Sequence, residues 1–204
     1  MDHLEIAIEQ MLTTYLSHLP ADELTEATAS LKNIVRQKTL TANQALQQTD
    51  GELKYIYFVY SGFVRCFYFD ANGNEVTHFF MKKNDFCYGE LMIRDLPVYL
   101  YYETISDCEF LYIPIKSLSD LMHTSDTLKS LYISVLENVL RYKMLREHGF
   151  LMQNATERYI NFSAAFQEIE KIAQQSHIAS YLGITPVSLS RIRRALRKEV
   201  PIHE

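Results

Sequence analysis

The first 37 residues have the spacing of amphipathic helices. Apolar side chains recur every three or four residues along 4–37, and Pro20 interrupts the pattern. We therefore predict two helices, one on each side of Pro20. The apolar positions that define them are Leu4, Ile8, Met11, Leu12, Tyr15, Leu16, Leu24, Ala27, Leu31 and Ile34.

Residues 39–114 have a different residue pattern. The runs YIYFVY, FVRCFYF, EVTHFF and EFLYIP are rich in β-branched and aromatic residues, which favour strands. Gly51, Gly62 and the Asn-Gly-Asn of 72–74 fall between the runs, where tight turns need residues that tolerate positive φ. The segment predicts a sandwich or barrel of short strands with an aromatic core.

A helical period returns between Ser125 and His148, with no Gly or Pro inside. A helix of this length is a rod of about 36 Å, longer than one small domain needs. Its apolar stripe is expected to contact another subunit, or alternatively to pack on the chain's own barrel. Gly149 follows the stripe, as a helix stop or a hinge. The stripe consists of Leu128, Leu131, Val135, Val139, Tyr142 and Leu145.

The stretch IASYLGITPVSLSRIRRALRK (178–198) has the spacing of a helix-turn-helix. Gly183 stands where a left-handed residue ends the first helix, and Ile184 fills the gap between the helices. Thr185 can cap the second helix, with Pro186 at its first position. Small Ala179 allows a close approach. The facing apolar residues are Ile178, Ala179 and Leu182 on one helix and Leu189 and Ile192 on the other.

The chain has 204 residues, a length that fits one large or two modest domains. Its composition, with 48% hydrophobic and 22% charged residues, is that of a folded protein. The first ten residues carry acids where a signal peptide needs positive charge, and no apolar run approaches the roughly 20 residues that span a bilayer. We expect a cytoplasmic protein without a membrane partner. Cys66, Cys87 and Cys108 are an odd number without CxxC spacing, as expected for reduced structural thiols.

Charge is distributed unevenly along the chain. The net charge is −5, yet residues 188–204 hold five Lys and Arg against two acidic residues. This reversal predicts an anionic partner for the second helix, and double-stranded DNA fits it. Arg191 and Ser190 are the candidates for reading bases. The remaining candidates for this surface are Thr185, Pro186, Val187, Ser188, Arg193, Arg194, Arg197 and Lys198.

The order of barrel, long helix and helix-turn-helix resembles the Crp/Fnr family of bacterial transcription regulators over nearly the whole chain. The resemblance implies an α+β fold: an N-terminal antiparallel jelly-roll barrel of the cyclic-nucleotide-binding type with flanking helices (1–118), a long dimerisation helix (119–149) and a C-terminal helix-turn-helix domain (150–204). It also implies a homodimer that binds promoter DNA and works with RNA polymerase.

Two departures from the family pattern concern DNA. Family recognition helices often carry a glutamate, then two residues, then serine and arginine; Ser190 and Arg191 match, but Val187 replaces the glutamate. Valine cannot accept a hydrogen bond from cytosine, although it can contact a thymine methyl group. Residues 156–177 read as helix, which leaves little room for the family's β-hairpin wing.

The segment that corresponds to the family's ligand site also departs from the family pattern. Gly89, Glu90 and Leu91 match the segment that opens the phosphate-binding helix of family members that bind cyclic AMP. Where those members place an arginine for the cyclic phosphate, Val98 and Tyr99 stand, and an unpaired buried phosphate is costly. Arg94, four positions before Val98, is the alternative partner. We expect no usual cyclic AMP site, and these positions form a different pocket or none.

Other chemistry can be screened in the same way. The family's iron–sulfur sensors use several N-terminal cysteines, and no Cys precedes Cys66. Haem remains an alternative sensing cofactor, because His78 or a cysteine can serve as its axial ligand. A cupin-type metal enzyme needs a His pair on neighbouring strands, whereas His78 is the one histidine in the predicted strands. We therefore expect no enzyme, metal site or cofactor. The alternative function is a sensing module that acts through a protein partner.

Overall fold

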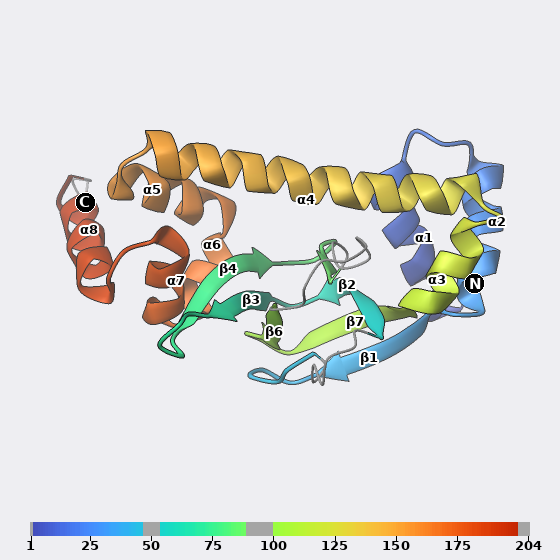
Figure 1. Cartoon of the computed structure of the whole chain (residues 1–204), viewed down its shortest axis with the longest axis horizontal. Coiled ribbons are helices and arrows are strands. Elements are labelled where there is room, and N and C mark those ends of the chain that lie inside the picture. The colour runs from blue at the N-terminus through green and yellow to red at the C-terminus, as the bar shows by residue number, and fades with distance from the viewer. Residues whose placement is uncertain (1, 47–53, 89–99, 200–204) are drawn as a thin grey trace, which may run out of the picture.

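The computed structural model describes residues 2–46, 54–88 and 100–199. Two antiparallel sheets lie under one long helix, α4 (Asp126–Met152), as Figure 1 shows. N-terminal helices pack at one end of α4, and a group of C-terminal helices packs at the other. The predicted α+β class with an antiparallel barrel is confirmed.

Among the described residues, the sheets contain four and three short strands, and the four aromatic runs of the sequence fall on four of these seven. Their orders are β1-β7-β2-β5 and β4-β3-β6, so strands far apart in sequence are neighbours. All paired neighbours are antiparallel. The strands are β1 (Arg36–Leu40), β2 (Tyr55–Ser61), β3 (Val64–Phe69), β4 (Glu75–Met81), β5 (Phe86–Cys87), β6 (Tyr101–Thr104) and β7 (Cys108–Pro114).

Aromatic side chains fill the space between the sheets. Phe58 and Phe110 are almost fully buried, and the rings of Tyr88 and Tyr102 lie 4.1 Å apart between centroids. Rings supply much apolar area and favour tilted contacts of this kind, so the predicted aromatic core is confirmed. The three cysteines are buried and free, as predicted.

The helices before α4 cover one end of the barrel. α1 (His3–Leu16) and α2 (Ala21–Lys32) lie on either side of Pro20, as predicted, and α3 (Ile115–Met122) follows β7. The buried side chains of α1 and of the first half of α4 belong to one hydrophobic core with the barrel. This core fixes the direction in which α4 leaves the barrel.

The long helix continues past the predicted stop at His148. Ser125 caps its start, and Gln153 N–H bonds the Gly149 carbonyl oxygen at 3.1 Å at its end. Gly149 therefore lies inside α4, and its expected place after the helix is wrong. One glycine costs a helix only about 1 kcal/mol, which the flanking turns and packing offset. Asn154 instead starts the next helix with a capping box.

Four helices follow α4: α5 (Ala155–Ala165), α6 (Gln167–Ile172), α7 (Gln175–Leu182) and α8 (Pro186–Glu199). Within residues 115–199, the structure contains no strand. The region predicted as helix instead of a hairpin wing is occupied by α5 and α6.

Candidate nucleic-acid interface

The turn between α7 and α8 has the geometry that the glycine predicted. Gly183 adopts the left-handed conformation, with φ 67° and ψ 34°. Its N–H bonds the Ser180 carbonyl oxygen at 3.1 Å, and Ile184 N–H bonds the Ala179 carbonyl oxygen at 3.0 Å. The second bond spans six residues, as in a Schellman motif, and satisfies a carbonyl that the end of α7 would leave unpaired.

The start of α8 is capped by a threonine. Thr185 Oγ1 accepts a hydrogen bond from Ser188 N–H at 3.1 Å, and Pro186 is the first helical residue. The two helices meet through apolar side chains, with Ala179 fully buried at the contact. This small core contains the predicted residues Ile178, Ala179, Leu182, Leu189, Ile184 and Ile192.

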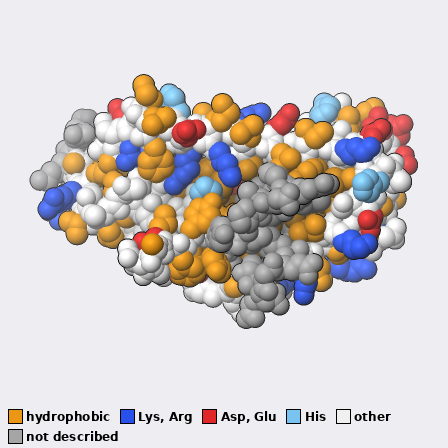
Figure 2. Space-filling model, viewed as in Figure 1, with side chains coloured by type: hydrophobic (Ala, Val, Ile, Leu, Met, Phe, Trp, Pro, Cys, Tyr) orange, Lys and Arg blue, Asp and Glu red, His pale blue; other side chains and the backbone are white. Residues whose placement is uncertain are grey.

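The opposite face of α8 is open to solvent. Val187 is 60% exposed, and Ser190, Arg191, Arg194 and Arg197 are also exposed. Thr185 and Pro186 are exposed at the start of the helix, Ser188 is half-buried, and the side chain of Lys198 lies outside the described residues. A blue patch of Lys and Arg appears at the left end of Figure 2, where α8 stands in Figure 1.

Arg193 points away from this face, which corrects the prediction that it joins the outward surface. Its Nε donates to the Tyr159 hydroxyl at 3.2 Å, and its Nη2 lies 3.6 Å from Glu170 Oε1. Arg193 thus attaches α8 to α5 and α6. Helical spacing placed this cation between the two faces, and a carboxylate on a neighbouring helix decided its direction.

Sequence reasoning missed Gln175, which also sets the angle between the helices. Its side-chain amide donates to the Pro186 carbonyl at 2.7 Å and to Ser190 Oγ at 2.5 Å. Ser190 is therefore oriented by α7 on a surface otherwise open to solvent. A glutamine at the first position of a helix gives no signal of such a contact in sequence.

The C-terminal part of α4 holds α7 through side chains that sequence reasoning did not assign. Arg146 Nη2 donates to the Tyr181 carbonyl oxygen at 2.8 Å, and the hydroxyls of Tyr142 and Tyr181 are 2.8 Å apart. From α5, Arg158 Nε donates to the Leu182 carbonyl oxygen at 3.2 Å. Arginines thus satisfy the last carbonyls of α7, a common way to complete a helix C-terminus.

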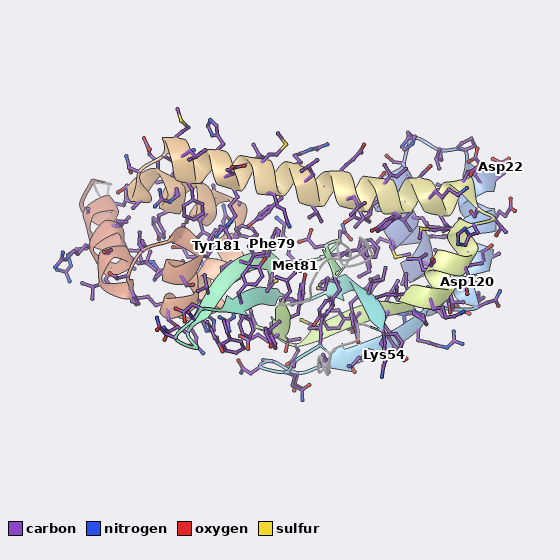
Figure 3. All side chains as sticks on the ribbon, viewed as in Figure 1. Asp22, Lys54, Phe79, Met81, Asp120 and Tyr181 are labelled. Carbon is purple, nitrogen blue, oxygen red and sulfur yellow. The ribbon has the colours of Figure 1, made fainter. Side chains whose placement is uncertain are left out.

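The barrel contacts α7 on its other side. Thr77 N–H on β4 bonds Ser180 Oγ at 2.8 Å, and Phe80 packs on Tyr181 with ring centroids 5.3 Å apart. Tyr181, Phe79 and Met81 are labelled in Figure 3 in the layer between α4 and β4. α7 therefore connects the helix-turn-helix to both the barrel and α4.

A buried charge cluster adjoins this contact. Arg65 is only 1% exposed and bonds the carboxylates of Glu75 and Glu103, with Nε at 2.7 Å from Glu103 Oε1. His177 on α7 lies 3.9 Å from Glu75, and burial with the nearby Arg65 lowers its pKa to about 4. Glu75, Glu103 and His177 have the donors of a metal site, but the Arg65 guanidinium already pairs with both carboxylates.

The residues predicted for a dimer contact mostly face the chain itself. Leu128, Leu131 and Val135 are buried in the monomer's core, so their assignment to another subunit is wrong. Val139 and Tyr142 are half-buried and line a cavity of about 280 Å³ between α4 and the β4–β5 region. Periodicity showed that a stripe is apolar, but it did not show which apolar surface covers it.

A second stripe on α4 is exposed. Leu145 is 67% exposed, and large apolar side chains also project at Ile133, Leu140, Met144 and Leu151. Orange side chains on the upper edge of Figure 2 follow the line of α4. Ile133, Leu140, Met144 and Leu151 follow one another at intervals of seven, four and seven positions. This is a heptad pattern, and it was present in the sequence on the second face of the helix.

The predicted ligand residues Gly89, Glu90, Leu91, Val98 and Tyr99 lie outside the described residues, as do Gly51 and Arg94.

His78, the haem candidate, is described. Its ring packs between Tyr68 and Phe79, and burial lowers its pKa to about 4. Its Nε2 is buried without a hydrogen-bond partner among the described groups. The neutral ring is therefore able to act as a ligand, but it is enclosed by aromatic side chains.

Comparison with known proteins gives concordant results. The family described as cyclic nucleotide-binding domain matches residues 37–125. Regulatory protein HlyX of Actinobacillus pleuropneumoniae is 25% identical over 194 residues, covering 88% of this chain and 78% of the relative. The anaerobic regulatory protein of Aggregatibacter actinomycetemcomitans is 25% identical over 182 residues, covering 82% and 70%.

Solved structures show the same fold. A transcriptional regulator of the Crp/Fnr family from Eubacterium rectale has a TM-score of 0.71 at 15% identity, with 90% of this chain and 86% of that chain covered. FixK2 from Bradyrhizobium japonicum has a TM-score of 0.68 at 18% identity, with 81% and 86% covered. In the described part of the chain, no helix has the length and apolar character to cross a membrane. Residues 37–125 thus match the cyclic nucleotide-binding domain, and most of the chain is similar in sequence to regulatory proteins and in fold to regulators of the Crp/Fnr type.

Proposed function

We propose that the protein is a dimeric, sequence-specific DNA-binding regulator whose α8 enters the major groove. The observation that carries the proposal is the outer face of α8. Arg191 and Arg194 are exposed there, and no carboxylate among the described side chains pairs with either. A cationic helix face held by a short turn is suited to the groove and its phosphates.

Individual roles follow from position. Arg191 is the candidate for bidentate contact with guanine, and Ser190 is held beside it by Gln175. Arg194 and Arg197 are candidates for phosphate contacts, and Val187 is free to contact a thymine methyl group. Arg193 supports the helix from behind. RNA polymerase remains the partner expected for a regulator on promoter DNA.

Dimerisation is proposed through the exposed stripe of α4. Ile133, Leu140, Met144 and Leu151 lie on a face that the barrel leaves open. Pairing two such helices in parallel buries this stripe and directs both copies of α8 to the same side of the DNA. Their half-sites are then about 34 Å apart, one turn of the duplex.

The effector is proposed to differ from cyclic AMP bound in the usual manner, because Val98 and Tyr99 stand where a phosphate-binding arginine is expected. The cavity beneath α4 is the candidate effector space. Phe79 and Phe86 supply apolar wall, while Lys82 and Asn138 supply polar groups. A mainly apolar ligand of small size suits this lining. No cofactor or metal is assigned.

The experiment begins by selecting bound sequences from a random DNA pool, with and without cell extract. Gel shifts on the selected site then compare wild type with Arg191→Ala, Arg194→Ala and the distant control Lys116→Ala, whose side chain is 90% exposed on α3. Arg191→Ala should weaken specific binding by about 1–3 kcal/mol and spare non-specific binding. Arg194→Ala should weaken both and reduce the salt slope by about 1.

Equal loss on all sequences for Arg191→Ala would contradict base reading. A flat response to salt would contradict DNA binding itself and favour the alternative of a protein partner docked on the C-terminal helices.

A further inference from the structure

A second cavity lies at the junction of α4 with the helix-turn-helix, next to the cavity beneath α4, with which it shares Tyr142 and Phe166. Its volume is about 390 Å³, within the range of small-molecule sites. The C-terminal end of α4, α5 and α7 form its walls. Aromatic rings make up much of this lining: Tyr142, Phe150, Phe162, Phe166 and Tyr181.

Two arginines line the same cavity. Arg146 and Arg158 lie 4.8 and 4.9 Å from the centroid of the Phe150 ring, so their guanidinium carbons are less than about 10 Å apart. The hydrogen bonds described for them go to backbone carbonyls, of Tyr181 for Arg146 and of Leu182 and Gln153 for Arg158. Carbonyls satisfy donors but leave the two positive charges without a counterion.

Acidic residues are missing from this lining. The described residues around the cavity include no Asp and no Glu, and no described carboxylate forms an ion pair with Arg146 or Arg158. The cavity beneath α4 differs, because Lys82 and Asp85 both line it. A partly enclosed site with two cations and no anion attracts a negatively charged group more strongly than the same cations would in bulk water.

We infer that this junction cavity binds a small aromatic acid. The carboxylate would accept charge-assisted hydrogen bonds from a guanidinium, whose planar fork fits it in a bidentate manner. The ring would pack against Phe162, Phe166 and Tyr181 in the apolar part of the lining. A cationic amine finds no carboxylate there, and a neutral ring leaves the arginine charges uncompensated. The lining therefore favours a ligand that carries a negative charge and an aromatic ring.

Binding of the acid in the junction cavity would directly affect the position of the helix-turn-helix. Arg146 and Arg158 hold the last carbonyls of α7, and the Phe150 ring lies against Gly183 in the turn. A carboxylate that engages either guanidinium changes the hold on α7 and hence the angle of α8. This consequence rests on the proposed DNA-binding function. Binding of the acid does not, and it is measured without DNA.

The test uses the full-length protein and 1-naphthoate as the probe. Because the chain has no tryptophan, probe fluorescence can be followed without that background. Wild type should bind one naphthoate per chain, and neutral 1-naphthamide should bind at least tenfold more weakly, as expected from the loss of a charge-assisted hydrogen bond. Arg146→Gln should weaken naphthoate about tenfold or more, whereas Lys116→Gln, which removes one distant charge, should leave it unchanged.

A second variant protects the test against misfolding of Arg146→Gln. Ala165→Phe adds a ring at the exposed Ala165 on the cavity wall and leaves both arginines in place. It should abolish naphthoate binding while the circular dichroism spectrum stays that of wild type. Equal affinity for naphthoate and naphthamide, equal loss in Lys116→Gln, or unchanged binding in Ala165→Phe would each overturn the proposal. If naphthoate binds as expected but has no effect on DNA affinity, the site stands and its link to α8 is wrong.

Discussion

Replacing the glycine of the helix-turn-helix by alanine has two separable costs, the strain of the backbone conformation and a steric contact. Gly183 has φ 67°, and a Cβ placed there would lie 2.8 Å from Cε1 of Phe150. The left-handed conformation costs an alanine about 1 kcal/mol. Phe150 is 42% exposed, but the two guanidiniums that pack on its ring oppose its displacement, so the overlap adds about 1–2 kcal/mol. Gly183→Ala should therefore lower the free energy of unfolding by about 2–3 kcal/mol.

Gly73 is the matched control. It lies in the β3–β4 turn with φ 81°, and a Cβ there meets nothing within 4 Å. Gly73→Ala should cost only the backbone term of about 1 kcal/mol. The smaller entropy of the unfolded alanine chain affects both variants equally, so it cancels in the difference.

Urea unfolding followed by far-ultraviolet circular dichroism gives the free energies by linear extrapolation. In the double variant, Phe150→Leu removes the ring that Gly183→Ala strikes, so the cycle should show a favourable coupling of about 1–2 kcal/mol. If Gly183→Ala cost no more than Gly73→Ala, or if the cycle showed no coupling, the contact between the turn and α4 would not bear on stability as described.

Three further predictions concern α4 and the histidines. Gly149→Ala should stabilise α4 by at most about 0.5–1 kcal/mol, raising the melting temperature, because the site is helical but Gln153 Oε1, 3.3 Å from the added Cβ, has to shift; a changed DNA affinity or ligand response would instead reveal a hinge. His177 is neutral in the fold with its pKa lowered from 6.5 to about 4, so its contribution to stability is full above pH 6.5 and is lost as pH falls toward 4. The loss is measured as urea stability against pH, and His177→Gln should reduce the slope to the share left by other groups with shifted pKa, among them His78, which acts in the same direction, and Asp85, whose raised pKa acts in the opposite direction. Replacing Leu140 and Met144 by glutamate should convert the proposed dimer to a monomer in sedimentation velocity, and a persisting dimer would mean that another face is used.

Sequence patterns identified most elements because each pattern has its own physical cause. The period of three and four residues marks helices, and the alternation of aromatic and β-branched runs with turn residues marks strands. Gly183, Thr185 and Pro186 predicted the helix-turn-helix in detail, since each has a local conformational role that does not depend on distant parts of the chain.

Errors arose where a distant surface decided the outcome. Helical position alone left Arg193 free to turn either way, and Glu170 and Tyr159 turned it inward. The stripe containing Leu131 and Val135 was apolar as predicted, but the barrel covers it. The helix continued through Gly149 because the next helix supplies its own cap at Asn154.

The sequence by itself determined the order of the elements, the turn at Gly183 and the basic character of α8. These depend on short-range conformational preferences and on charge, which neighbouring residues suffice to set. Only the tertiary structure decided which face of α4 stays exposed, which arginine of α8 is turned inward, and that Arg146 and Arg158 share a cavity without an acid. Such outcomes depend on which groups, far apart in sequence, come within hydrogen-bonding or ion-pair distance, and periodicity carries no information on that.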